Sequence, residues 1–76
     1  MNLIRCFSNV VGHKEAQDLV IDLNQMKSSQ SEPFYIEYDR SKDYYKDDTY
    51  VVVGNVTEED WVGLNLDMDF MEADLI

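Results

Sequence analysis

The fold is decided by the stretch KEAQDLVIDLNQM, residues 14–26. Apolar residues recur there every three or four positions, which is the spacing of one face of an α-helix. These residues are Ala16, Leu19, Val20, Leu23 and Met26. Glu15 and Asp18 stand near the predicted N-terminus and Lys27 follows the predicted C-terminus, where the helix dipole favours each sign of charge. The stretch therefore predicts an amphipathic helix over residues 14–26.

Strand patterns flank this helix on both sides. Residues 3–11 are rich in apolar side chains and end at Gly12, which predicts a first strand followed by a turn. After Pro33, residues 34–39 alternate with the period of two that is typical of a half-buried strand. Residues 49–53, TYVVV, predict a third strand that pairs with the second as a hairpin across residues 40–48. Gly54 and Asn55 are expected to end it.

The C-terminal part begins with a helix signal and then becomes ambiguous. Thr57 is a good N-cap and acids follow it, so we predict a short helix over residues 58–63. For residues 64–70 two patterns compete, a helical stripe and a strict strand alternation. The helical stripe is Trp61, Leu64, Met68, Met71 and Leu75, and the strand alternation is Leu64, Leu66, Met68 and Phe70. We expect Trp61, Leu64, Met68 and Phe70 to be largely buried, against the sheet or against a second copy of the chain.

Together these elements predict an α+β fold and one small acidic domain over residues 1–76. Its order is approximately β-α-β-β, followed by an acidic C-terminal helical turn and then a strand or helix. A chain of 76 residues is too short for a second domain and builds only a thin core.

The charge of the chain excludes some functions. Sixteen Asp and Glu stand against six Lys and Arg, a formal net charge of −10, and no Lys, Arg or His follows Lys46. Direct binding to a nucleic-acid backbone needs clustered cations and is therefore not expected. With the single cysteine Cys6, no internal disulfide forms. Neither a signal peptide nor a membrane span is recognisable, so we expect a cytoplasmic protein.

No motif points to catalysis, a cofactor or a metal. Cys6 and His13 are the available Cys–His pair, but their spacing carries little information, and a cysteine in an apolar strand usually behaves as a small hydrophobe. Residues 65–69, NLDMD, begin like a calcium loop, yet Phe70 stands where that loop needs Gly and Ile76 where it needs Glu. We predict a protein without enzymatic activity, cofactor or metal.

Acids interleaved with tyrosines form the remaining constellation. Tyrosine is a common interface anchor, and Tyr44 and Tyr45 lie in a polar segment. Carboxylates two apart on a strand are about 6.6 Å apart, and those four apart on a helix are about 6 Å apart, so both can present anions in phosphate-like rows. Asp67 with Asp69 and Glu37 with Asp39 fit the strand spacing, and Asp18 with Asp22 fits the helical one. The predicted partner-binding residues are Glu37, Asp39, Asp43, Tyr44, Tyr45, Asp47, Asp48, Asp67, Asp69, Glu72 and Asp74.

In size, acidity and lack of catalytic motifs, the chain resembles small inhibitors encoded by phages and mobile elements, among them anti-CRISPR proteins, anti-restriction proteins and uracil-DNA glycosylase inhibitors. This resemblance of composition implies a DNA mimic that binds a basic nucleic-acid-binding protein and occludes its nucleic-acid site. The alternative is a generic acidic interaction module without mimicry, such as an antitoxin-like or immunity-like partner or a small subunit. A homodimer that buries the apolar C-terminal residues is also open.

Overall fold

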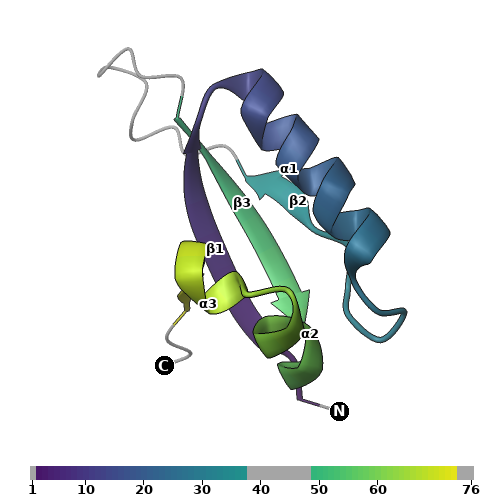
Figure 1. Ribbon diagram of the computed structural model, residues 1–76. Coiled ribbons are helices and arrows are strands. Elements are labelled where there is room, and N and C mark those ends of the chain that lie inside the picture. The colour runs from purple at the N-terminus through teal and green to yellow at the C-terminus, as the bar shows by residue number, and fades with distance from the viewer. Residues whose placement is uncertain (1, 38–48, 74–76) are drawn as a thin grey trace.

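The protein folds as a four-stranded antiparallel sheet with its helices on one face, which confirms the predicted α+β class (Figure 1). The computed structural model describes residues 2–37 and 49–73. The elements in chain order are β1 (Ile4–Val11), α1 (His13–Met26), β2 (Tyr35–Glu37), β3 (Thr49–Val56), α2 (Glu58–Gly63), α3 (Leu66–Asp69) and β4 (Met71–Glu72). The strand order is β2-β3-β1-β4, so the first strand lies inside the sheet and the fourth covers part of its edge.

The pairing of β1 with β3 fixes which residues share a face. Ile4 lies opposite Val56, and the register runs without interruption to Val11 opposite Thr49. Because side chains alternate along a strand, Cys6 and Val52 point to one side of the sheet and Phe7 and Val53 to the other. We call the first side the helix face and the second the open face.

Helix α1 packs on the helix face much as its apolar spacing predicts. Ala16 and Leu23 are buried against the sheet, whereas Met26 at the end of the apolar stripe is 57% exposed. The helix ends there because Lys27 adopts an extended conformation. Asn24 then ties the helix to the start of β2, since its side-chain amide donates to the carbonyl oxygen of Phe34 at 3.2 Å and its Oδ1 accepts from the N–H of Phe34 at 2.7 Å.

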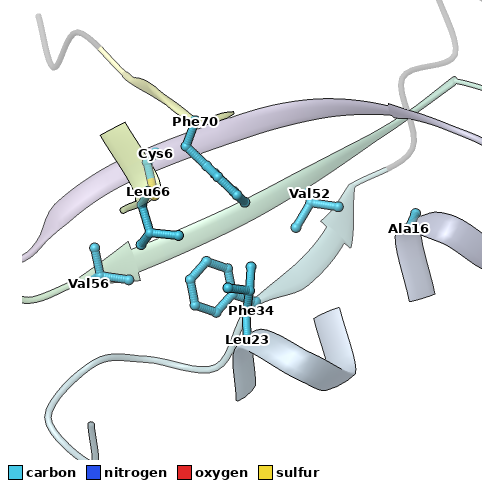
Figure 2. Packing of buried hydrophobic residues seen from close by; sticks show 8 residues of the cluster. All are labelled: Cys6, Ala16, Leu23, Phe34, Val52, Val56, Leu66 and Phe70. Atoms are coloured by element: carbon cyan, nitrogen blue, oxygen red, sulfur yellow. The ribbon is translucent and has the colours of Figure 1, made fainter. Parts of the chain in front are cut away.

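The core lies between the sheet and the helices (Figure 2). Its buried residues are Cys6, Ala16, Leu23, Phe34, Val52, Val56, Leu66 and Phe70. At its centre the ring of Phe34 packs directly against Gly54. The contact is so close that a Cβ atom at Gly54 would stand only 2.3 Å from Phe34 Cε2. The prediction that Gly54 and Asn55 end the third strand is therefore wrong. Strand β3 continues to Val56, and the glycine makes room for the ring.

The C-terminal segment matches neither of its two interpretations over its whole length. Helix α2 has the predicted bounds, and Thr57 Oγ1 accepts from the N–H of Asp60 at 3.2 Å as an N-cap. Asn65 then adopts a left-handed conformation with φ 54°, which breaks any continuous helix or strand. After it, Leu66 and Phe70 are buried one helical turn apart, whereas Met68 is 78% exposed.

Two burial predictions for this segment need correction. The expected burial of Met68 against the sheet is wrong, because α3 turns this side chain away from the core. Trp61 and Leu64 are partly buried against the core cluster rather than largely enclosed by it. The chain then leaves α3 to form β4, whose Met71 pairs with Phe7 of β1.

Candidate interaction surfaces

The helices carry most of the exposed acids that the structure describes. We call these exposed helix acids together the acidic helix layer; they are Glu15, Asp18, Asp22, Glu58, Glu59, Asp67 and Asp69. Lys14 is the one Lys or Arg within the bounds of the three helices. Its Nζ lies 3.4 Å from Asp18 Oδ2, and both side chains are well exposed, so this pair contributes little stability. The layer is thus strongly negative and almost unneutralised by neighbours.

Helix α1 arranges its acids in a row. Glu15, Asp18 and Asp22 follow one another at intervals of three and four residues, which places them along one stripe of the helix. The row from Glu15 to Asp22 extends about 10 Å along the helix axis at 1.5 Å per residue. The helical spacing predicted for Asp18 and Asp22 is therefore present, and both residues are exposed.

The acids of α2 and α3 are arranged differently. Glu58 and Glu59 line a shallow depression together with Val62 and Gly63. Asp67 and Asp69 lie in α3, where residues two apart are separated by about 200° around the axis. The strand spacing predicted for this pair is therefore not realised, because the segment is helical where the alternation needed a strand.

The sheet separates the other predicted site residues. Glu37 lies in β2 and Glu72 in β4, at opposite edges of the sheet, so these two carboxylates do not form one site. Seven further predicted residues fall outside the described part of the chain. They are Asp39, Asp43, Tyr44, Tyr45, Asp47, Asp48 and Asp74. Among the described residues, Glu15, Asp18 and Asp22 lie along one stripe of α1, and Glu58 and Glu59 line one depression on α2.

Asp60 follows two exposed acids in the first turn of α2, but the fold uses it internally. Its carboxylate is buried and accepts hydrogen bonds from the N–H of Ser28 at 2.9 Å, from Ser28 Oγ at 3.0 Å and from Ser31 Oγ. Burial alone would raise the pKa of Asp60, but the hydrogen bonds from Ser31 and Ser28 and the charge of Lys27 outweigh it and lower the pKa. Asp60 thus fastens the turn after α1 to α2.

Cys6 and His13 do not meet. The Cys6 thiol is fully buried and donates to the carbonyl oxygen of Gly54 at 3.6 Å. Burial raises the pKa of Cys6 to about 11, which leaves the thiol protonated at neutral pH. His13 instead packs on Tyr50, with ring centroids 5.1 Å apart. Tyr50 pairs with Val10, four residues or about 13 Å along β1 from Cys6.

The open face of the sheet is a second candidate surface. A single register row crosses all four strands, with Tyr35 opposite Val53, Val53 opposite Phe7 and Phe7 opposite Met71. Tyr35 is 42% and Met71 54% exposed at the two ends of this row, whereas Val53 between them is only 2% exposed. We call these four residues the apolar row. Sequence reasoning missed it, although Val51 and Val53 alternate with Tyr50 and Val52 and so place apolar side chains on both faces of β3.

Comparison with known proteins finds no matching family model, curated protein or solved structure. Within residues 2–37 and 49–73, no helix combines the length and apolarity needed to cross a membrane. The same residues contain no cluster of three or more His, Cys, Asp or Glu side chains able to hold a metal ion.

Proposed function

We propose that this chain is a small acidic inhibitor that binds a basic nucleic-acid-handling protein and occludes its nucleic-acid site. The acidic helix layer is the observation that carries this proposal. A groove built for nucleic acid already directs Lys and Arg side chains toward phosphate positions, and a row of exposed carboxylates can occupy some of those positions. The proposal places the chain in the cytoplasm, where such targets work and where Cys6 stays reduced.

The energetics favour a role for the unneutralised acids. Like charges on a small frame destabilise the folded state through self-repulsion, and Asp22, Glu58 and Glu59 have no ion pair among the described residues. A basic partner converts this repulsion into attraction, and long-range steering accelerates the encounter. Binding of this kind weakens as salt screens the charges.

Paired charge removal tests the proposal. The immobilised chain captures targets from a nuclease-treated lysate, and one purified target is then measured against variants. Glu58→Gln with Glu59→Gln, and Glu15→Gln with Asp22→Asn, each remove two charges from the acidic helix layer. Glu32→Gln with Glu37→Gln removes two exposed charges elsewhere and is the matched control.

The proposal predicts that both helix-layer variants associate with the target several-fold more slowly and with a weaker dependence on salt, while the control changes little. Equal effects of all three variants would mean that net charge alone attracts the target. No effect of either helix-layer variant would contradict the proposal.

The apolar row favours the alternative function, a protein-interaction module without nucleic-acid mimicry. Aromatic and methionine side chains are enriched in protein interfaces, and Tyr35 and Met71 stand exposed beside Phe7 on a charge-poor face. Under this alternative, substitutions in the apolar row weaken target binding, whereas those in the acidic helix layer do not.

A further inference from the structure

The depression on α2 contains a glycine that the fold itself does not require. Gly63 is the last residue of the helix, its φ is not positive, and a Cβ atom there would meet nothing within 4 Å. Since glycine weakens a helix relative to alanine, neither the backbone nor the packing of this chain explains its presence. Glycine also serves where another molecule approaches the backbone closely. The space at Gly63 is therefore a candidate contact site.

The residues that line this depression share one face of α2. Val62 follows Glu58 by four positions and Gly63 follows Glu59 by four, and residues so spaced are neighbours on a helix. All of them are exposed, Val62 to 65%. The volume of about 440 Å³ is open to solvent and suits one long side chain. This α2 depression thus has an apolar end, Val62 and Gly63, and an acidic end, Glu58 and Glu59.

We propose that the α2 depression binds an arginine side chain of the basic target, an inference that rests on the proposed function. Charge complementarity favours a cation, because no Lys or Arg in residues 2–37 and 49–73 forms an ion pair with Glu58 or Glu59. The exposed Val62 favours a cation with an apolar stem, since long basic side chains lay their methylene groups along apolar surface. The planar guanidinium can donate to two neighbouring carboxylates at once, whereas the lysine ammonium is a compact point charge.

The two ends of the depression make different contributions to binding. Carboxylates at the edge of an interface mainly accelerate the encounter and give it a dependence on salt. Close packing of the arginine stem on Val62 and against the backbone of Gly63 mainly slows dissociation. Charge removal and filling of the depression therefore have separate kinetic signatures.

N-acetylarginine amide tests the site without the target. It is titrated into the full chain at constant ionic strength, and the backbone amides are followed by NMR. N-acetylcitrulline amide keeps the stem without the charge, and the guanidinium ion keeps the charge without the stem. We expect the arginine probe to shift the amides of Val62 and Gly63 saturably, with a dissociation constant at least about threefold lower than that of either control probe. No shift at these amides, or equal affinity for all three probes, would overturn the proposal.

Substitutions in the depression extend the test to the purified target. Gly63→Leu fills the space without changing the charge, and Asn9→Leu, at an exposed uncharged position of β1, is the matched control. We expect Gly63→Leu to raise the dissociation constant at least about tenfold, through faster dissociation and with unchanged salt dependence, and the control to change it less than about twofold. If circular dichroism shows that Gly63→Leu does not fold, Val62→Ala takes its place and should weaken binding about threefold.

The outcomes separate this inference from the proposed function. If Glu58→Gln with Glu59→Gln weakens target binding but Gly63→Leu does not, the proposed function stands and the arginine site is refuted. If Gly63→Leu weakens binding but the paired charge removal does not, the occupant is apolar rather than cationic, and the arginine site is refuted as well.

A double-mutant cycle identifies the occupant. Each arginine in the nucleic-acid site of the target is replaced by glutamine in turn. For one of them, the loss of affinity should be at least about threefold smaller with Gly63→Leu than with the unmodified chain. Coupling of Gly63→Leu to a lysine, or to no target residue, would contradict the proposal.

Discussion

Adding one methyl group at Gly54 should destabilise the protein strongly. The new Cβ would stand 2.3 Å from Cε2 and 2.7 Å from Cδ2 of Phe34, closer than Cβ atoms come to other heavy atoms, and 3.0 Å from Cζ. The ring has little room to retreat, because it packs edge-on against Phe70 with centroids 5.9 Å apart and Asn24 holds the Phe34 backbone. Overpacking of this kind costs about 1–3 kcal/mol.

This cost is a large fraction of the total stability, which is about 4–11 kcal/mol for a chain of 76 residues. Urea unfolding followed by the fluorescence of Trp61 measures it. Gly63→Ala is the matched control, because its Cβ meets nothing within 4 Å and alanine suits a helix better than glycine. We expect Gly63→Ala to be neutral or slightly stabilising.

A double-mutant cycle isolates the contact. In a Phe34→Leu background, which removes the outer ring atoms, Gly54→Ala should cost at least about 1 kcal/mol less than in the unmodified chain. Equal costs in the two backgrounds would refute the packing of the Phe34 ring on Gly54. The strand backbone itself accepts alanine, since Gly12 is the one described glycine with a positive φ.

Three further predictions concern charge and the buried polar groups. Because the pKa of Asp60 is lowered below its ordinary value of 3.8, the stabilisation by its carboxylate is fully present above that pH and is lost as the pH falls through the folded-state pKa. The difference in melting temperature between the unmodified chain and Asp60→Asn should therefore stay constant from pH 7 to 5 and shrink below about pH 4. Over the same range from pH 7 to 5, or on adding salt, the melting temperature should rise, since both changes weaken the repulsion among excess acids, and a fall under both would show that ion pairs dominate. Cys6, with a pKa of about 11 and no exposure, should react with a thiol reagent only in denaturant, and rapid labelling of the native protein would contradict its burial.

The main elements of the fold were predictable because their patterns have one interpretation. The spacing of Ala16 and Leu23 fits only a helix, and Thr57 followed by acids fits only a capped helix start. Strand pairing of β2 with β3 also agrees with the predicted hairpin. Local sequence was sufficient in these cases, since each signal lies within one turn or one strand.

The remaining features depend on contacts distant in sequence. Gly54 looks like a strand breaker until Phe34, twenty positions earlier, is found resting on it. Asp60 resembles its exposed neighbours, and only the approach of Ser28 and Ser31 makes it a buried anchor. The joining of β4 to β1 likewise needs the tertiary fold, because Met71 and Phe7 lie in opposite halves of the chain.

The placement of exposed acids on the helices was only partly predictable. The row in α1 follows from helical spacing alone, whereas the split of Asp67 from Asp69 depends on the left-handed turn at Asn65 that precedes α3. The apolar row needed the register of all four strands, which no single strand pattern contains.

Competition with nucleic acid tests the central proposal most directly. A purified target bound to the chain is titrated with a short DNA duplex and, in parallel, with its single strand, at constant ionic strength. The proposal predicts that a nucleic acid the target normally binds displaces the chain completely and stoichiometrically, because both occupy one basic groove. A stable ternary complex of target, nucleic acid and chain at saturating nucleic acid would contradict it.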